Sequence, residues 1–203
     1  MFLVINTLWL LGTLTVVLAP PALFGMFYVA NETAHKRGFD FRDFFSGARL
    51  YFAKSWIWGA LNIIAAVLFW GNFTLYPRFA GQFTTPLLIT TVALLIVWLS
   101  VQLYAIPYIM ELEKPSVGTA LRNGLFTALA SPLLTVCLGL IVGVLVLVCL
   151  IQPSFALFGF GALSALISTH AVLERLETFG IRTPKAAEAP DDPLLQDDPS
   201  NKS

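Results

Sequence analysis

The stretch Leu133–Ile151, LLTVCLGLIVGVLVLVCLI, contains no charged residue. A helix of about 20 apolar residues is long enough to cross the hydrocarbon core of a bilayer, which is about 30 Å thick. Helix is the expected conformation in lipid because it satisfies its own backbone hydrogen bonds. The stretch therefore predicts a transmembrane helix and places the chain among α-helical membrane proteins.

Four further apolar stretches accompany it. They are Phe2–Ala30, Trp56–Leu75, Pro86–Met110 and Phe155–Leu173. The whole chain is 57% hydrophobic and 12% charged, against about 25% charged in soluble domains. We therefore expect an all-α, polytopic transmembrane bundle of about five spans, with residues 1–182 forming a single membrane domain. Residues 183–203 are rich in Asp and Pro and are expected to form a disordered acidic tail.

The first stretch allows two interpretations because Pro20 and Pro21 interrupt it. One long broken helix is preferred, since residues 22–34 are short for a crossing and include Asn31 and Glu32. The alternative is a hairpin at the two prolines, which gives six spans and a cytoplasmic N-terminus. The stretch lacks the basic start of a secretory signal, so we expect it to be retained.

Basic residues orient the predicted spans. Cytoplasmic loops of membrane proteins carry the excess of Lys and Arg. Here the basic residues gather on one side of the pattern: Lys36, Arg37, Arg42, Arg49 and Lys54, then Lys114 and Arg122, then Arg175, Arg182 and Lys185. The other two connectors contain only Arg78. This distribution predicts a multi-pass membrane protein with a cytoplasmic C-terminus and, for five spans, an extracellular N-terminus.

Two cytoplasmic connectors show the same helical spacing of apolar residues. The positions are Phe41, Phe44, Phe45, Ala48 and Phe52 in the first, and Val117, Ala120, Leu121, Gly124 and Ala128 in the second. Each set predicts an amphipathic helix at the membrane interface. Each connector follows a long apolar stretch and leads directly into the next one, so the sequence suggests a duplicated unit of parallel sense.

The residues offer little that could support catalysis. Acidic residues are confined to connectors and helix ends, and no recognisable metal or nucleophile motif appears, so we expect neither a cofactor nor an enzyme. Asn62 and Gln102 are the first candidates for the lining of a polar cavity, although hydrogen bonds between helices are the commoner use of such residues.

A second candidate site is a surface for a protein partner on the cytoplasmic side. Its predicted members are Phe41, Arg42, Phe44, Phe45, Arg49, Glu111 and Glu113. Simple ion pairing at the membrane surface is the alternative use of the charged members. The formal net charge of zero gives no indication of nucleic acid as a partner. The expected partners are the lipid bilayer, for the apolar stretches, and subunits of a membrane transporter, for the cytoplasmic surface.

Two segments resemble a known family. The first runs from Asn6-Thr7-Leu8-Trp9-Leu10-Leu11 through Ala19-Pro20-Pro21-Ala22-Leu23 to Phe27-Tyr28, and the second is Phe41-Arg42-Asp43-Phe44-Phe45. Together they resemble the YesL family. The resemblance implies a bacterial plasma-membrane protein with a domain of unknown function, often associated with carbohydrate uptake, and it supplies no catalytic or ligand residues.

Two functions follow as hypotheses. The first is a non-enzymatic accessory protein that works with a membrane or cytoplasmic partner, in carbohydrate uptake if the resemblance holds. The second is a small solute transporter or channel, because broken helices frame many transport sites.

Overall fold

The computed structural model describes residues 2–15, 17–35, 40–152 and 160–178. These residues form eight α-helices and one short 3-10 helix, so the predicted all-α class is confirmed. The elements are α1 (Phe2–Leu14), α2 (Ala19–Ala34), α3 (Phe41–Leu50), α4 (Phe52–Phe79), η1 (Gly81–Phe83), α5 (Thr84–Glu111), α6 (Val117–Ala130), α7 (Pro132–Ile151) and α9 (Phe160–Thr178). The predicted tail at 183–203 and the predicted start of the fifth span at Phe155 lie outside the described residues.

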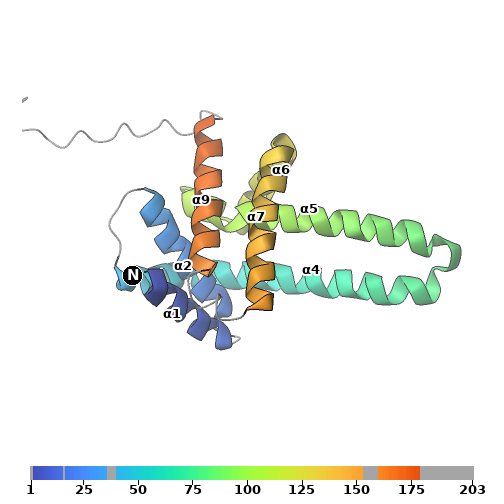
Figure 1. Cartoon of the computed structure of the whole chain (residues 1–203), viewed down its shortest axis with the longest axis horizontal. Coiled ribbons are helices and arrows are strands. Elements are labelled where there is room, and N and C mark those ends of the chain that lie inside the picture. The colour runs from blue at the N-terminus through green and yellow to red at the C-terminus, as the bar shows by residue number, and fades with distance from the viewer. Residues whose placement is uncertain (1, 16, 36–39, 153–159, 179–203) are drawn as a thin grey trace, which may run out of the picture.

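Within the described residues, three helices are long and apolar enough to cross a membrane: α4, α5 together with η1, and α7. The spans predicted at 56–75, 86–110 and 133–151 are thereby confirmed as long apolar helices. Helices α4 and α5 form a hairpin that projects from the rest of the molecule (Figure 1). The chain reverses at Gly81, whose φ of 52° lies in the left-handed region that glycine adopts without strain.

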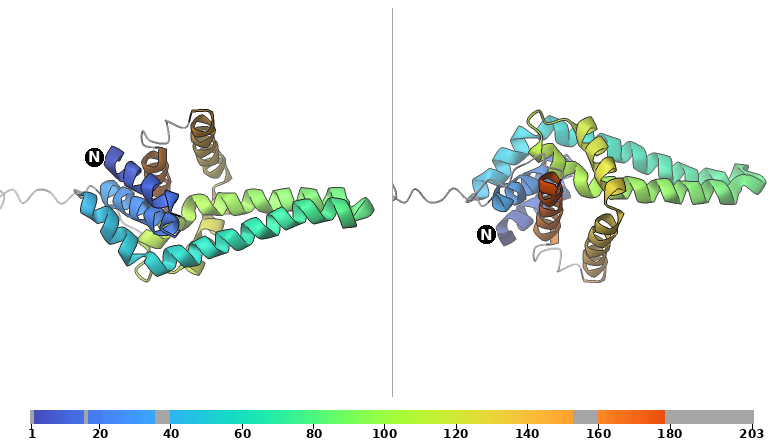
Figure 2. Two further views of the ribbon diagram at one scale, coloured as in Figure 1. Left: turned by 90° about the horizontal axis from the view of Figure 1, so that it is seen from below. Right: turned by 90° about the horizontal axis from the view of Figure 1, so that it is seen from above.

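The three long helices do not form a parallel bundle. Helix α7 runs across the α4–α5 hairpin in Figure 1, and both views of Figure 2 agree. It is fixed mainly through its first half, where Thr135 and Leu138 are buried, while most of its later side chains are exposed. The prediction of a bundle is wrong in this respect, because apolar composition fixes the helix but not the direction in which it leaves its neighbours.

The first apolar stretch is not one broken helix. Trp9 of α1 and Met26 of α2 both lie within 3.0 Å of the point that a Cβ on Gly161 would occupy. A straight helix would separate these two residues by about 25 Å, so α1 and α2 must fold back on each other. The structure thus has the antiparallel pair of the hairpin alternative, with the turn just before Pro20. The start of α1 lies at the same end of the pair as the end of α2 (Figure 2).

Helix α9 takes the place of the predicted fifth span, but it belongs to the interior of the helical core. Its buried face is mostly small: Gly161, Ala162, Ala165, Ser168, Thr169 and Ala171. Small residues allow backbones to approach closely, and α9 packs against α2 and α5. Neither α9 nor the α1–α2 pair is among the helices long and apolar enough to span a membrane.

The two predicted amphipathic helices are confirmed as α3 and α6. Each folds back on the helix that precedes it, α3 on α2 and α6 on α5. Asp40 caps α3 by accepting a hydrogen bond from the Phe41 amide at 2.6 Å, and the Asp43 carboxylate accepts one from the Asp40 amide at 2.7 Å. Ser116 caps α6 through a longer contact with the Thr119 amide, 3.5 Å. A side-chain oxygen at this position satisfies a backbone donor that the helix leaves free.

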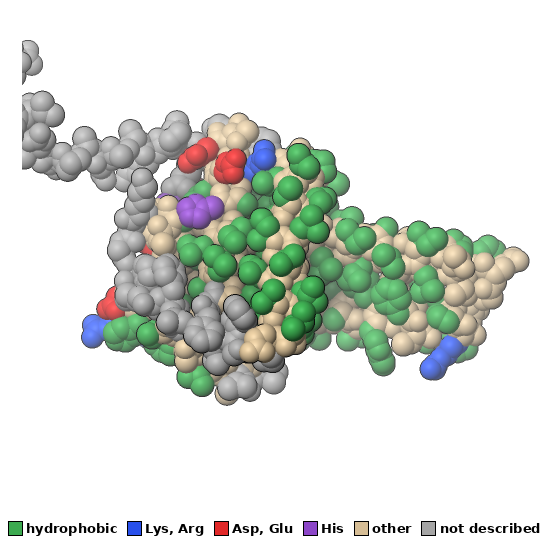
Figure 3. All heavy atoms as spheres, in the orientation of Figure 1, with side chains coloured by type: hydrophobic (Ala, Val, Ile, Leu, Met, Phe, Trp, Pro, Cys, Tyr) green, Lys and Arg blue, Asp and Glu red, His purple; other side chains and the backbone are tan. Residues whose placement is uncertain are grey.

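Apolar and charged side chains separate on the surface. Figure 3 shows hydrophobic side chains over α7 and the hairpin, and charged ones gathered mainly at the end of α9 and at the end opposite the hairpin tip. Exposed apolar area of this extent is exceptional for a soluble monomer. It fits contact between the long helices and a lipid bilayer.

Candidate functional site

Two helix ends meet in a polar cluster. The Glu111 carboxylate, at the end of α5, accepts a hydrogen bond from the Asn31 side-chain amide of α2. Its Oε1 also lies 3.4 Å from His35 Nε2, and only 11% of the His35 side chain and 12% of the Glu111 side chain are exposed. The cluster ties α2 to α5 at the point where both helices leave the core.

The histidine in this cluster has a definite hydrogen-bonding role. His35 Nδ1 lies 2.7 Å from the Asn31 carbonyl oxygen, which can only accept, so Nδ1 carries a proton. The other ring nitrogen then faces a carboxylate. The cluster therefore closes the junction of two helices through contacts of Asn31 and His35 with one carboxylate.

Tyr51 lies near the same cluster, between α3 and α4. Burial raises the pKa of its phenol above the usual value of 10.0, and nearby Tyr28, Glu111 and Glu32 raise it further. Its ring contacts Phe24, with centroids 6.2 Å apart. Tyr51 is therefore a neutral hydrogen-bonding group at physiological pH, and it holds the start of α4 against α2.

An open cleft of about 920 Å³ lies beside Glu111. It runs between the end of α5, the connector that follows it, α6 and the last turns of α9. Its lining contains both polar and apolar residues: Tyr108, Glu111, Leu112, Glu113, Lys114, Thr119, Asn123, Phe126, Thr127, Ala130 and Leu176. Carboxylates, an ammonium group and an amide in one cleft could bind a small polar molecule by hydrogen bonds.

The residues predicted for partner docking do not lie on one surface. Phe44 is only 4% exposed and packs against Gly25 of α2, whereas Phe41 and Phe45 are 46% and 54% exposed. The Arg42 guanidinium lies 5.8 Å from the centre of the Phe41 ring. We call Phe41, Arg42 and Phe45 the α3 patch. Arg49 is also exposed on α3, while Glu111 is enclosed by the polar cluster and Glu113 lines the cleft.

Asn62 and Gln102 meet between α4 and α5. Gln102 Oε1 accepts a hydrogen bond from Trp58 Nε1 at 2.9 Å, and Asn62 Nδ2 lies 3.5 Å from the same oxygen. Asn62 also donates to the Trp58 carbonyl at 2.9 Å. The two contacts to Gln102 are hydrogen bonds between helices, which is the commoner use of such residues. A cavity-lining role for Asn62 and Gln102 stays a prediction.

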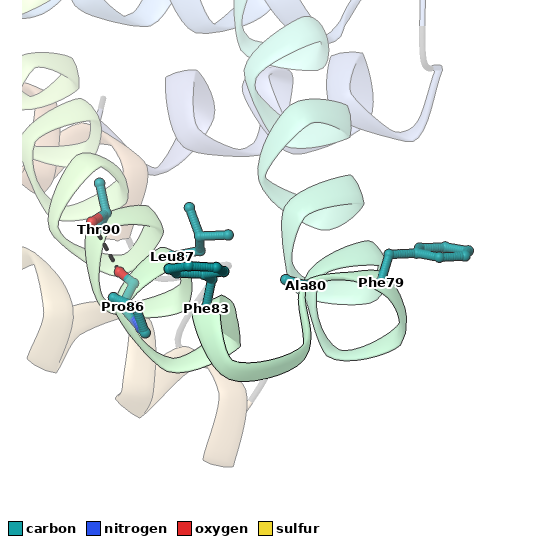
Figure 4. Close-up of a pocket in the computed structure, with 6 residues that line it drawn as sticks. All are labelled: Phe79, Ala80, Phe83, Pro86, Leu87 and Thr90. Carbon is teal, nitrogen blue, oxygen red and sulfur yellow. Dashed lines mark hydrogen bonds between the residues drawn. The ribbon is translucent and has the colours of Figure 1, made fainter.

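A smaller hollow of about 470 Å³ lies at the hairpin tip. Figure 4 shows Phe83 and Leu87 side by side within it and Phe79 pointing away. Thr90 donates its hydroxyl to the Pro86 carbonyl at 2.9 Å, so this hydroxyl is used within the helix. The hollow therefore offers apolar and aromatic surface rather than a set of reactive groups.

Sequence reasoning missed the hydrogen bonds that hold α6 and α7 to α5. The Tyr108 and Thr127 hydroxyls lie 2.6 Å apart, and the Tyr104 and Thr135 hydroxyls lie 3.0 Å apart. These pairs are far apart in the sequence and follow no motif spacing. The described residues hold no group of three or more His, Cys, Asp or Glu side chains placed to bind a metal ion.

Comparisons with known proteins give no relative: no family model, no curated protein and no solved structure matches the chain. The resemblance to the YesL family stays a prediction.

Proposed function

We propose that the chain is a non-enzymatic accessory protein of the plasma membrane, inserted through its long apolar helices. Its partner is another membrane protein, which it contacts through the α3 patch. The observation that carries the proposal is the orientation of α3. Phe44 is buried and fixes the helix, while Phe41 and Phe45 remain exposed beside Arg42. Aromatic residues and arginine are enriched where proteins bind one another.

The position of the α3 patch supports this role. Helix α4 has 28 residues and is about 42 Å long at helical rise. A hydrocarbon core is about 30 Å thick, so when the hairpin tip reaches one interface, α3 lies at or beyond the other. The excess of basic residues in this connector assigns that side to the cytoplasm. Carbohydrate uptake as the setting rests only on the resemblance to the YesL family.

Site-specific photocrosslinking in native membranes tests the proposal. A photoreactive amino acid at Phe45 is expected to give a discrete adduct with one membrane protein, which Phe41→Ser weakens. The control is the same probe at Phe79, an aromatic position at the hairpin tip that is also exposed. Adducts with lipid alone from position 45, or the same protein adduct from both positions, would contradict the proposal.

The alternative is a small solute transporter, favoured by the polar cleft beside Glu111. Purified protein in liposomes distinguishes the two functions. Flux of a small polar solute by the protein alone, reduced by Asn123→Leu inside the cleft, would favour transport. Asn62 and Gln102 would then be tested as further cavity residues.

Topology is tested separately. After Cys137 and Cys149 are replaced by serine, single cysteines at Ala80 and Ser46 are expected to react with a membrane-impermeant maleimide from opposite sides. Labelling from the same side would show that the hairpin does not cross the membrane.

A further inference from the structure

A third cavity, of about 640 Å³, lies along the side of the hairpin, between α4, α5 and α6. Its walls are apolar along most of their length, with Leu68 on α4 and Leu94 on α5, which are 62% and 56% exposed. Trp98 of α5 and Leu125 of α6 also line it. This elongated groove therefore opens where the hairpin would face lipid.

One charged side chain lines the groove, and it is a cation. Arg122 lies on α6 at the inner end, and no carboxylate is among the lining residues. Arg122 is exposed and has no ion-pair partner among the described residues. A guanidinium binds phosphate through parallel hydrogen bonds and keeps its charge at any physiological pH.

The positions of Arg122 and Leu94 along the hairpin match the depths of a lipid phosphate and of an acyl chain. Val101, at the Arg122 end, is 17 residues from Thr84 at the tip, or about 26 Å. That distance is close to the thickness of the hydrocarbon core, about 30 Å, so Arg122 falls at the level of lipid phosphates. Leu94 is 10 residues from Thr84, about 15 Å, near the middle of the bilayer.

We propose that the groove binds one anionic phospholipid, with its phosphate on Arg122 and an acyl chain along Leu68, Leu94 and Trp98. The inference rests on the proposed crossing of the hairpin through the bilayer. An anionic headgroup is favoured over a zwitterionic one because it brings no cationic group to face the arginine. A basic residue at the surface attracts anionic lipid by about fivefold in affinity.

Two tryptophans make the site measurable in the intact protein. Trp98 lines the groove, and Trp70, on the same hairpin, is 71% exposed and reports bulk lipid contact. The full chain is reconstituted in phosphatidylcholine vesicles with increasing fractions of brominated phosphatidylglycerol or brominated phosphatidylcholine. The Trp98 and Trp70 contributions to fluorescence quenching are the differences between the wild type and Trp98→Phe or Trp70→Phe.

The expected result is that Trp98 quenching reaches half of its maximum at about a fivefold lower fraction of the anionic lipid. Trp70 should be quenched equally by both lipids. Arg122→Gln should abolish the preference at Trp98 and Arg122→Lys should restore part of it, whereas Arg78→Gln, an exposed arginine at the other end of α4, should leave it unchanged. Circular dichroism confirms that each variant keeps its helix content.

Two results would overturn the inference in distinguishable ways. Equal quenching of Trp98 by both lipids, or a preference that survives Arg122→Gln, reduces the groove to ordinary lipid contact while leaving the membrane insertion intact. An absence of quenching at Trp70 by either lipid contradicts the insertion of the hairpin itself, and with it the membrane part of the proposed function.

Discussion

The unit α2–α3–α4 and the unit α5–α6–α7 have the same order of helices but are held together differently. In both, an amphipathic helix folds back on its predecessor and leads into a long apolar helix. Equivalent positions are 76 residues apart, as for the helix caps Asp40 and Ser116 and for Tyr28 and Tyr104. This agreement favours the duplication suggested by the sequence.

The difference lies in what fixes the amphipathic helix. In the first unit, Gly25 lies against the backbone of Phe44, Gly47 lies against the side chain of Tyr28, and a reciprocal pair of carboxylates caps α3. In the second, tyrosine hydroxyls on α5 bind threonines on α6 and α7. The comparison shows that one helical order can be stabilised by close packing in one copy and by hydrogen bonds in the other.

The largest expected difference between the two units is the loss of stability when a glycine is replaced by alanine. A Cβ on Gly47 would lie 2.6 Å from Tyr28 Cγ, and a Cβ on Gly124 would lie 3.1 Å from the Val101 carbonyl oxygen. We expect Gly47→Ala to cost about 3 kcal/mol and Gly124→Ala about 1 kcal/mol, because overpacking is destabilising. Thermal unfolding in detergent micelles measures both. Gly118→Ala, with open space around it, is the control and should show no loss.

The next largest effect on stability is expected at the polar cluster around Glu111, which joins the two units. Glu111→Ala removes the acceptor of Asn31 and the partner of His35, and an unsatisfied buried donor costs about 1–3 kcal/mol. Glu113→Ala, at an exposed position two residues away, should change the free energy of unfolding by less than about 0.5 kcal/mol. Equal effects would show that the cluster does not join α2 to α5.

Within the second unit, the hydroxyl groups of Tyr108 and Tyr104 should contribute unequally to stability. Tyr108→Phe removes the 2.6 Å contact with Thr127 and is expected to cost about 1 kcal/mol. Tyr104→Phe should cost less, since the Thr135 hydroxyl also lies 3.0 Å from the Ser131 carbonyl oxygen. Denaturant titration of the two variants gives the order, and a larger loss for Tyr104→Phe would contradict it.

The helix caps should give the smallest difference. Asp40→Ala loses a reciprocal capping pair and is expected to cost about 1 kcal/mol. Ser116→Ala loses only a contact of 3.5 Å and should cost about half as much. Helix content near the melting temperature, followed by circular dichroism, compares them. A greater cost for Ser116→Ala would mean that α6 depends on its cap more than α3 does.

Sequence alone predicted the features that depend on local composition. Uninterrupted apolar length identified α4, α5 and α7, and apolar spacing identified α3 and α6. It gave the wrong course for residues 2–34, because Pro20 fits equally well in a kinked helix and in the first turn of a new one. The transverse course of α7 depends on contacts with α5 and α9, which no local pattern encodes.

For the candidate sites too, the sequence identified residue types but not the contacts that these residues make in the fold. The sequence identified the polar residues within spans, but no local pattern indicates that the Trp58 indole donates to Gln102 beside Asn62. The periodicity grouped Phe41, Phe44 and Phe45 on one apolar face, and the structure separates them because α3 buries the side that carries Phe44, Gly47 and Tyr51. Glu111 was placed among surface carboxylates, since nothing local indicates that Asn31 and His35 enclose it.

The length of the hairpin has a mechanical consequence. Helices α4 and α5 are about 42 Å long, and a bilayer accommodates such excess length by tilting the helices at a modest energetic cost. Because α3 and the polar cleft are fixed to the inner end of the hairpin, a change in tilt swings both relative to the membrane plane. In the proposed membrane crossing, bilayer thickness would therefore set the angle at which this end of the protein is presented.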